Sequence, residues 1–303
     1  MSDLGKRDYP ALSYPSLTRF VRKLRGGSQA ILAEADDGLL YVVKFTNNLQ
    51  GPNVLFNESM GSELYRACGL PVAEWTPVRV TNAFLDQNRA GWLQTETQNL
   101  RPASGLAFGS RFLGNDASRL IEILPESRFG QVRNLQQIWL AWMVDICAEH
   151  GDNRQAIFQN SDGALSMVFI DHGHLFGGPD GGRRVHFSAS RYLDTRVYPA
   201  VTDRFLHRLT RIGRSLKVDE LWRAMECMPE QWRTPSAASS FAACIERLTN
   251  SAVLVDIVQS MVALQSRTKT YARTTQFPIL RAAVPSRRAE PGRRGRGDRL
   301  VYA

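Results

Sequence analysis

The first third of the chain alternates short apolar runs with turns rich in glycine and aspartate. Residues 21–45, VRKLRGGSQAILAEADDGLLYVVKF, predict three strands separated by turns at residues 26–28 and 36–38. The segments VAEWTPVRVT and AGWLQTE predict further strands. The pattern therefore indicates a small β-rich unit.

One helix is predicted to interrupt these strands. In LFNESMGSELYRACGLP, apolar residues recur at helical spacing from Leu55 to Ala67. Gly69 and Pro71 follow this run, and such a pair is typical of a helix end, because glycine accepts a left-handed cap and proline cannot continue the helix.

After Gly114 the periodicity becomes helical. Residues 131–150, QVRNLQQIWLAWMVDICAEH, predict one long amphipathic helix, and DELWRAMECM and FAACIERLTNSAVLVDIVQSMVALQS predict further helices. Between them, AIFQNSDGALSMVFID predicts a hairpin that turns at residues 161–163. The predicted order is a β-rich unit with one helix, then a helical unit that contains one hairpin.

The composition is that of a folded protein, with 43% hydrophobic and 22% charged residues. No apolar run is long enough to span a membrane, and the first residues lack the apolar centre of a secretory signal. We therefore expect no membrane association and a cytoplasmic location. Cys68, Cys147, Cys227 and Cys244 lie far apart in apolar helical patterns, without zinc-ligand spacing, so we expect reduced, buried thiols.

The net charge of +9 is concentrated near the C-terminus. Residues 281–303 carry seven arginines against two acidic residues, a net charge of +5, in a segment rich in proline and glycine. Such a segment cannot build a core, so we expect residues 269–303 to form a disordered basic tail. The tail is either simply solvated or contacts nucleic acid or an acidic partner. The remaining charge of +4 does not indicate a dedicated nucleic-acid-binding domain.

Two aspartates lie at the two ends of the predicted hairpin, Asp152 in HGDNRQ and Asp171 in FIDHG. A hairpin brings its ends together, so we expect the two carboxylates to be neighbours. One such carboxylate can help to hold Mg²⁺ with phosphate and water, and the other can accept a proton from an attacking hydroxyl. Phosphoryl transfer needs this division of work.

Three earlier features suit phosphate binding. The turn Gly26-Gly27-Ser28 can bring backbone N–H groups close to phosphate oxygens. Lys44 ends an apolar strand and can hold a phosphate as a point charge. Glu58 or Glu63, on the following helix, can pair with that lysine. Each feature alone is common in proteins that bind no nucleotide, and only their joint order is informative.

The order of GGS, VVK, NE, HGD and IDHG resembles the protein-kinase-like fold. The stretches LFNESMGSELYRACGLPV, LAFGSRFLG, DNRQAIF and VFIDHGHLFG resemble the HipA-like kinase domain family of bacteria, over about residues 18–265. The resemblance implies an α+β, two-lobed fold: an N-terminal extension over residues 1–17, a small β-rich N-lobe with one helix over 18–110, and a mainly helical C-lobe over 111–268. It also implies ATP and Mg²⁺ as cofactors.

The resemblance implies a role for each matching catalytic position. Lys44 would contact the α- and β-phosphates of ATP, and Glu58 would orient it. Asp152 would be the catalytic acid–base residue, and Asp171 would bind Mg²⁺. Arg154 would brace the loop or the transferred phosphate.

The resemblance also implies how ATP would be enclosed. The turn Gly26-Gly27-Ser28 would lie over the phosphates. The segment from Gly109 to Leu113 would be the hinge, whose backbone reads adenine through Gly109, Ser110, Phe112 and Leu113.

One position departs from the usual kinase pattern, which places a metal-binding asparagine five residues after the catalytic aspartate. Here that residue is Ile157, which cannot bind metal. We expect Gln155 to supply an amide oxygen instead, with Asn153 as the other candidate. His150 is expected to pack as a structural residue.

We therefore expect an ATP- and Mg²⁺-dependent phosphotransferase that transfers the γ-phosphate to a hydroxyl, with a HipA-like serine/threonine protein kinase as the favoured interpretation. A nucleotide-binding pseudokinase or regulatory module and a small-molecule kinase of the aminoglycoside or choline type stay open as alternatives. A metal site built from His150, His172 and His174 is a less favoured possibility. The sequence does not name the protein or small-molecule acceptor.

Overall fold

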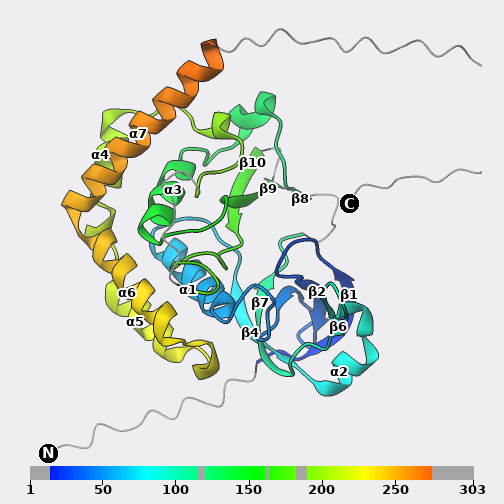
Figure 1. Ribbon diagram of the computed structural model, residues 1–303. Helices are drawn as coiled ribbons and strands as arrows, with labels where there is room; N and C mark the ends of the chain where they lie inside the picture. The colour runs from blue at the N-terminus through cyan, green and yellow to red at the C-terminus, as the bar shows by residue number, and fades with distance from the viewer. Residues whose placement is uncertain (1–13, 115–119, 162–163, 182–189, 275–303) are drawn as a thin grey trace, which may run out of the picture.

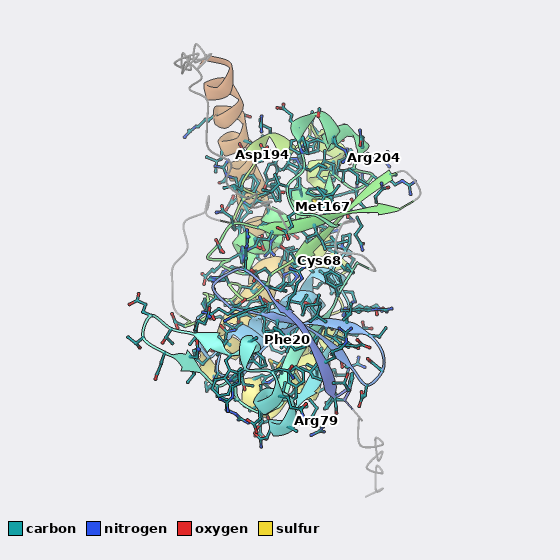
Figure 2. The ribbon with its side chains drawn as sticks, turned by 90° about the vertical axis from the view of Figure 1, so that its right-hand side faces the viewer. Phe20, Cys68, Arg79, Met167, Asp194 and Arg204 are labelled. Carbon is teal, nitrogen blue, oxygen red and sulfur yellow. The ribbon has the colours of Figure 1, made fainter. Side chains whose placement is uncertain are left out.

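The computed structural model describes residues 14–114, 120–161, 164–181 and 190–274. Figure 1 shows a β-sheet region at one end of the molecule and helices curving around the other. In the side view of Figure 2, Phe20 and Arg79 mark the sheet region, and Met167 and Arg204 mark the helical region. The predicted order, sheet first and helices second, is confirmed at this level.

The sheet region is built on five antiparallel strands in the order β1-β2-β3-β7-β4. The strands are β1 (Leu17–Lys23), β2 (Ile31–Ala35), β3 (Leu40–Lys44), β4 (Trp75–Val80) and β7 (Gly105–Arg111). The three strands predicted in residues 21–45 are confirmed, although the first begins earlier. One face of the sheet buries Ile31, Val43 and Val78 in a small core of its own.

The segment between β4 and β7 differs from the prediction. It forms α2 (Asn82–Gln87), the 3₁₀ turn η1 (Arg89–Gly91) and the short strands β5 (Leu93–Gln94) and β6 (Asn99–Leu100). The strand predicted in AGWLQTE is thus only two residues long. The Thr81 hydroxyl accepts a hydrogen bond from the Phe84 N–H and caps α2, a signal that we did not use.

The helix α1 (Val54–Ala67) ends as predicted. Gly69 adopts a left-handed backbone at φ +75°, its N–H donates to the Arg66 carbonyl, and the Leu70 N–H donates to the Tyr65 carbonyl. Nearly every side chain of α1 is buried, because the helix lies between the sheet and the helices α5 and α6 (Figure 1). Its apolar residues belong to the larger core of the helical region.

The helix α3 (Gln137–Cys147) is shorter than predicted, because Val132 forms a β-bridge with Leu165 and the chain then turns before the helix begins. The 3₁₀ turn η3 (Glu126–Gln131) lies before this bridge. The prediction of a single apolar stripe was also wrong. Residues on all sides of α3 are buried, including Ile138, Met143 and Asp145, since the helix lies inside the helical region against α6 and α7.

The predicted hairpin is confirmed. β9 (Gln155–Ser161) and β10 (Ala164–Ile170) pair antiparallel, with Ser161 opposite Ala164 and Gln155 opposite Ile170. The turn residues 162–163 lie outside the described residues. β8 (Leu120–Ile121) adds a third strand beside β9.

The remaining helices pack against α1, α3 and one another. They are α4 (Asp203–Leu209), α5 (Val218–Cys227), α6 (Pro235–Thr249) and α7 (Ser251–Thr274), with the 3₁₀ turns η4 (Thr195–Val197), η5 (Ile212–Arg214) and η6 (Glu230–Trp232). The predicted run FAACIERLTNSAVLVDIVQSMVALQS is two helices, because the Asn250 side chain accepts hydrogen bonds from the N–H groups of Ala252 and Val253 and starts α7.

The C-terminal boundary also moves. α7 continues to Thr274, beyond residue 269, where the tail was predicted to begin, and residues 275–303 lie outside the described residues. None of the helices in the described part of the chain combines the length and the apolarity needed to cross a membrane.

The cysteines differ from the prediction at one position. Cys68, Cys147 and Cys244 are free and buried, but Cys227, at the end of α5, is exposed because that end of the amphipathic helix faces solvent. Burial raises the pKa of Cys68 and Cys147 to about 12, so these two thiols stay protonated at neutral pH.

Gly61 allows α1 to approach the segment that follows the hairpin. A Cβ atom at this position would lie 2.5 Å from the His172 Cβ and 2.6 Å from a Leu175 methyl group. Although alanine favours helix by about 1 kcal/mol over glycine, we expect Gly61→Ala to destabilise the protein by about 1–3 kcal/mol through this clash. Urea unfolding measures the change. Gly130→Ala is the control, because its Cβ would meet nothing within 4 Å, and equal stability of both variants would contradict the packing argument.

Candidate active site

Three charged side chains from distant parts of the chain meet where the sheet adjoins α1 and the hairpin. Lys44, the last residue of β3, is only 7% exposed. Its Nζ donates hydrogen bonds to Glu58 Oε1 on α1 and to Asp171 Oδ1 just after β10, the latter at 2.9 Å. The sequence analysis named Glu58 or Glu63 as a partner of Lys44 and placed Asp171 at the same site, and the structure brings Lys44, Glu58 and Asp171 together.

The charges in this cluster shift one another's protonation. Burial alone would lower the pKa of Lys44, but Asp171 and Glu58 together raise it above its ordinary value. Burial would raise the pKa of Asp171, yet the Lys44 ammonium outweighs it and holds that pKa well below the usual carboxyl range. Burial raises the pKa of Glu58, and Lys44 opposes this rise. The cluster therefore holds an ammonium and an ionised Asp171 at neutral pH.

The structure distinguishes between the two glutamates that the sequence left open. Glu58 is buried, pairs with Lys44, and accepts a hydrogen bond from the His172 N–H at 3.2 Å. Glu63 instead accepts hydrogen bonds from Arg66 and from the Trp75 indole. Glu63, the second choice, is therefore not the partner of the lysine.

Asp171 has an uncommon backbone conformation. Its φ of +58° lies in the left-handed region, which non-glycine residues seldom adopt. Arg154 holds this strained turn, because its Nη1 donates to the carbonyl oxygens of Ile170 and Asp171 at 2.9 and 3.2 Å.

Arg154 is itself fixed by a buried ion pair. Its Nε and Nη2 donate to the two carboxylate oxygens of Asp145 at 2.8 and 2.7 Å, and the Tyr65 hydroxyl donates to the same carboxylate at 2.6 Å. Arg154 is 2% exposed. Of the two roles expected for Arg154, the structure favours bracing the loop over contact with a transferred phosphate. We did not predict Asp145, although an aspartate within the apolar run WMVDIC was the available signal.

The residues expected to hold metal and to act as base lie at the two ends of the hairpin: Asp152 on the loop before β9, Gln155 at the start of β9 and Asp171 just after β10. Gln155 Nε2 donates to Asp171 Oδ2 at 3.0 Å, so the two expected metal ligands are neighbours. Ile157 is buried within β9. Asp152 is partly exposed, and one of its oxygens accepts a hydrogen bond from the Asn153 N–H. Among the described residues nothing else hydrogen-bonds to its carboxylate.

The turn Gly26-Gly27-Ser28 is connected to the segment after Asp171 through Gln50. The Gln50 amide nitrogen lies 3.0 Å from the His174 Nε2 and 2.8 Å from where a Cβ of Gly27 would be. The Asn48 amide also donates to the Ser28 carbonyl at 3.2 Å. The polar loop TNNLQGPN thus positions the turn, which we did not predict.

The predicted hinge needs a correction at its first two residues. Gly109 and Ser110 lie inside β7 and pair with β3 on one side and β4 on the other, so their backbone groups are engaged in the sheet. The Phe112 N–H donates to the Leu40 carbonyl, and the Leu113 carbonyl accepts from the Gln159 amide. The Phe112 carbonyl and the Leu113 N–H have no hydrogen-bond partner among the described residues.

Three histidines, His150, His172 and His174, lie near this site without forming a metal centre. His150 and His172 are buried, and burial followed by the charge of Arg154 lowers the pKa of both well below the ordinary value, so they are neutral. In the part of the chain that the structure describes, no group of three or more histidine, cysteine or acidic side chains is placed to hold a metal ion. The site considered for His150, His172 and His174 thus has no structural support.

Comparisons with known proteins give no family assignment. No family model matches the sequence, and no curated protein matches it. Among solved structures, hydra Fam20 with sugar superposes with a TM-score of 0.51 and 10% identity, over 83% of this chain and 88% of that chain. This likeness shows the fold alone. The fold is similar to that of hydra Fam20.

Two further structures are similar at lower scores. The Helicobacter pylori proinflammatory kinase CtkA has a TM-score of 0.49 and 12% identity, over 80% of this chain and 98% of that chain. The Golgi casein kinase has a TM-score of 0.43 and 13% identity, over 81% and 72%. None of these three structures is named as a HipA-like kinase, so membership of that family stays a proposal.

The Asp145–Arg154 pair gives a test of stability. We expect Asp145→Asn to lower the free energy of unfolding by about 3 kcal/mol or more, because it leaves a buried guanidinium without its counter-charge. Urea unfolding followed by tryptophan fluorescence measures the change. The control is Glu220→Gln, which breaks the exposed pair with Lys217 and should cost at most about 1 kcal/mol. Equal losses in the two variants would contradict a structural role for the buried pair.

The charge cluster gives a test of pH dependence. In Lys44→Met, Glu58 and Asp171 face each other without a cation, so the pKa of at least one carboxyl rises above its unfolded value of about 4. A carboxyl with a raised folded-state pKa adds stability as the pH falls. We therefore expect the free energy of unfolding of Lys44→Met to increase between pH 7.5 and 5 relative to the parent protein, in metal-free buffer. Lys217→Met is the control, and an identical pH profile in both variants would argue against the coupling.

Proposed function

We propose that this protein is an ATP- and Mg²⁺-dependent phosphotransferase that transfers the γ-phosphate of ATP to a hydroxyl. The observation that supports this best is the meeting of Lys44, Glu58 and Asp171 from β3, α1 and the end of the hairpin. A buried lysine between two carboxylates adds little to the stability of the fold, because the desolvation of the charges offsets much of their attraction. A functional task for the lysine therefore accounts for it better than stability does. In a kinase-like fold, that task is to bind phosphate.

Lys44 is poised to bind a phosphate oxygen. Its ammonium has three N–H donors, of which Glu58 and Asp171 engage two. The third can reach the α- and β-phosphates, while Glu58 keeps the side chain in place. We further propose that the turn Gly26-Gly27-Ser28 covers the phosphates and that the backbone of Phe112 and Leu113 reads adenine.

Asp171 and Gln155 fit a divalent cation. The carboxylate of Asp171 is ionised at neutral pH, and Gln155 contacts it and can turn its amide oxygen towards the same point. Mg²⁺ takes few protein oxygens and completes its shell with water and phosphate. When bound, it neutralises charge on the transferred phosphate. Asp171 and Gln155 would hold it there.

Asp152 is the proposed acid–base residue. It lies on the loop between α3 and β9, which Arg154 anchors to the backbone beside Asp171. The Asp152 carboxylate oxygen that does not bind the Asn153 N–H accepts the proton of the acceptor hydroxyl. The hydroxyl oxygen meanwhile bonds to the γ-phosphorus, and the bond from that phosphorus to the leaving ADP oxygen breaks. The protein then holds the proton, and ADP carries away the leaving negative charge.

The hydroxyl that receives the phosphate belongs either to a protein or to a small molecule. We propose a two-lobed, HipA-like kinase of the cytoplasm that phosphorylates a protein serine or threonine, because the motif order resembles that family. A small-molecule hydroxyl, as in kinases of the aminoglycoside or choline type, is the alternative acceptor. The shared fold supports both equally.

One observation favours a second candidate function, a nucleotide-binding pseudokinase or regulatory module. Ile157 occupies the position of the usual metal-binding asparagine and is buried in β9. If the Gln155 amide does not replace that ligand, ATP binds without turnover. Turnover measurements separate the two candidates.

We expect Asp152→Asn to reduce Mg²⁺-dependent ATP turnover or autophosphorylation by about 10²–10⁴-fold, the usual contribution of a positioned base. It should leave the ATP-induced rise in melting temperature intact. Asp171→Asn should lose turnover and also the Mg²⁺-dependent part of that rise. The control is Asp256→Asn, an exposed position on α7.

The outcomes separate the candidates. A thermal shift with ATP but no turnover, unaffected by Asp152→Asn, supports the pseudokinase. No shift at millimolar ATP contradicts both nucleotide functions.

A further inference from the structure

A basic surface lies on α4 and the turn after it, elements that contribute no residue to the candidate active site. Residues 203–217 carry five lysines and arginines against one acid, Asp203, a net charge of +4. The tail over residues 281–303 accounts for +5 of the total of +9. Residues 203–217 therefore hold all of the remaining net positive charge, and the charges of all other residues sum to zero.

The arginines of this stretch share one side of the helix. Arg204 and Arg208 are four residues apart on α4, and Arg211 follows in the next helical turn, so the three lie on one face. They and Arg214 are exposed. Figure 2 shows Arg204 at the outer edge of the helical region. We call Arg204, Arg208, Arg211 and Arg214 the α4 face.

The α4 face lacks counter-charges. No side chain of these four arginines forms an ion pair or hydrogen bond with another described residue, and only Arg208 has a contact, with the Phe205 ring at 6.0 Å. Some exposed arginines elsewhere do pair with an acidic side chain, as Arg19 and Arg196 do; isolated ones such as Arg79 have no such partner among the described residues, and the α4 face differs in placing four cations close together. Four neighbouring cations without partners repel one another, which favours the binding of an anion.

The helix under these arginines is held rigidly. Thr202 caps its start by accepting a hydrogen bond from the Phe205 N–H. Leu209 is buried, and Phe205 and Leu206 pack against the larger core. α4 also contacts α7, the helix that precedes the arginine-rich residues 281–303 in the chain.

We propose that the α4 face binds the phosphate backbone of a nucleic acid. A protein interface needs an apolar or aromatic centre, and a membrane-surface helix needs a free apolar face. The exposed large hydrophobic residues of the described chain are Val21, Leu49, Ile123, Leu193 and Val255, none of which lies in residues 201–217. The apolar side of α4 is already used in the core. What remains is a row of guanidinium groups, which suit phosphate geometry without reading base sequence.

The test is fluorescence anisotropy of the full chain with a labelled 20-nucleotide single strand of DNA and a 20-base-pair duplex, titrated between 50 and 200 mM KCl. We expect salt-dependent binding without sequence preference. The triple variant Arg204→Gln/Arg208→Gln/Arg211→Gln should bind at least about tenfold more weakly. Its slope of log K against log salt should flatten by about 0.7–0.9 for each phosphate that the variant no longer neutralises.

A charge-matched control separates a specific surface from net charge. Arg22→Gln/Arg79→Gln/Arg89→Gln removes three exposed cations from the sheet region, and Arg79 lies at the opposite end of the molecule in Figure 2. This variant should keep the slope and the affinity of the parent protein. Equal losses in both triple variants would overturn the proposal, because net charge would then explain the binding.

Three more measurements complete the design. Circular dichroism must show that both variants keep their fold. If deletion of residues 281–303 abolishes binding while the α4 variant leaves it unchanged, the tail is the binding element and the proposal fails. Tighter binding of polyglutamate or of vesicles rich in anionic lipid than of DNA would overturn the nucleic-acid class. None of these assays needs ATP, so their outcome is independent of the proposed phosphotransferase activity.

Discussion

The contact of the Lys44 ammonium with the carboxylates of Glu58 and Asp171 is the constraint on which this structure depends. A buried charge is tolerated only when its partners are in place, since the interior does not solvate it. The contact therefore requires β3, α1 and the hairpin to be correctly placed at the same time. The arrangement that pairs these buried charges is therefore the same one that assembles the candidate active site.

The position of α1 explains how the contact is held. The helix packs into the larger core with α5 and α6, not into the core of the sheet. Two buried asparagines also attach it to the segment after Asp171: the Asn57 amide donates to the Gly173 and Gly178 carbonyls, and the Asn53 N–H donates to the Pro179 carbonyl. Glu58 is thereby fixed relative to Asp171 before any ligand binds.

A second buried ion pair, Asp145 with Arg154, stabilises the position of Asp171. Asp145 orients Arg154, which in turn holds the carbonyl groups on either side of the strained turn at Asp171. The strain is maintained by the surrounding hydrogen bonds. The arginines of the α4 face have no such partners among the described residues, and this contrast separates a cation that stabilises the fold from cations available to a ligand.

The sequence by itself determined the features that depend on near neighbours. These are the strands of residues 21–45, the end of α1 at Gly69 and the hairpin, because periodicity and turn residues act over a few positions. Only the tertiary structure decided which glutamate pairs with Lys44, that Arg154 faces Asp145, that Gly109 and Ser110 lie inside a strand, and which cysteine is exposed. The physical reason is separation along the chain: Lys44 and Asp171 are 127 residues apart, and no local pattern encodes which side chains meet across that distance.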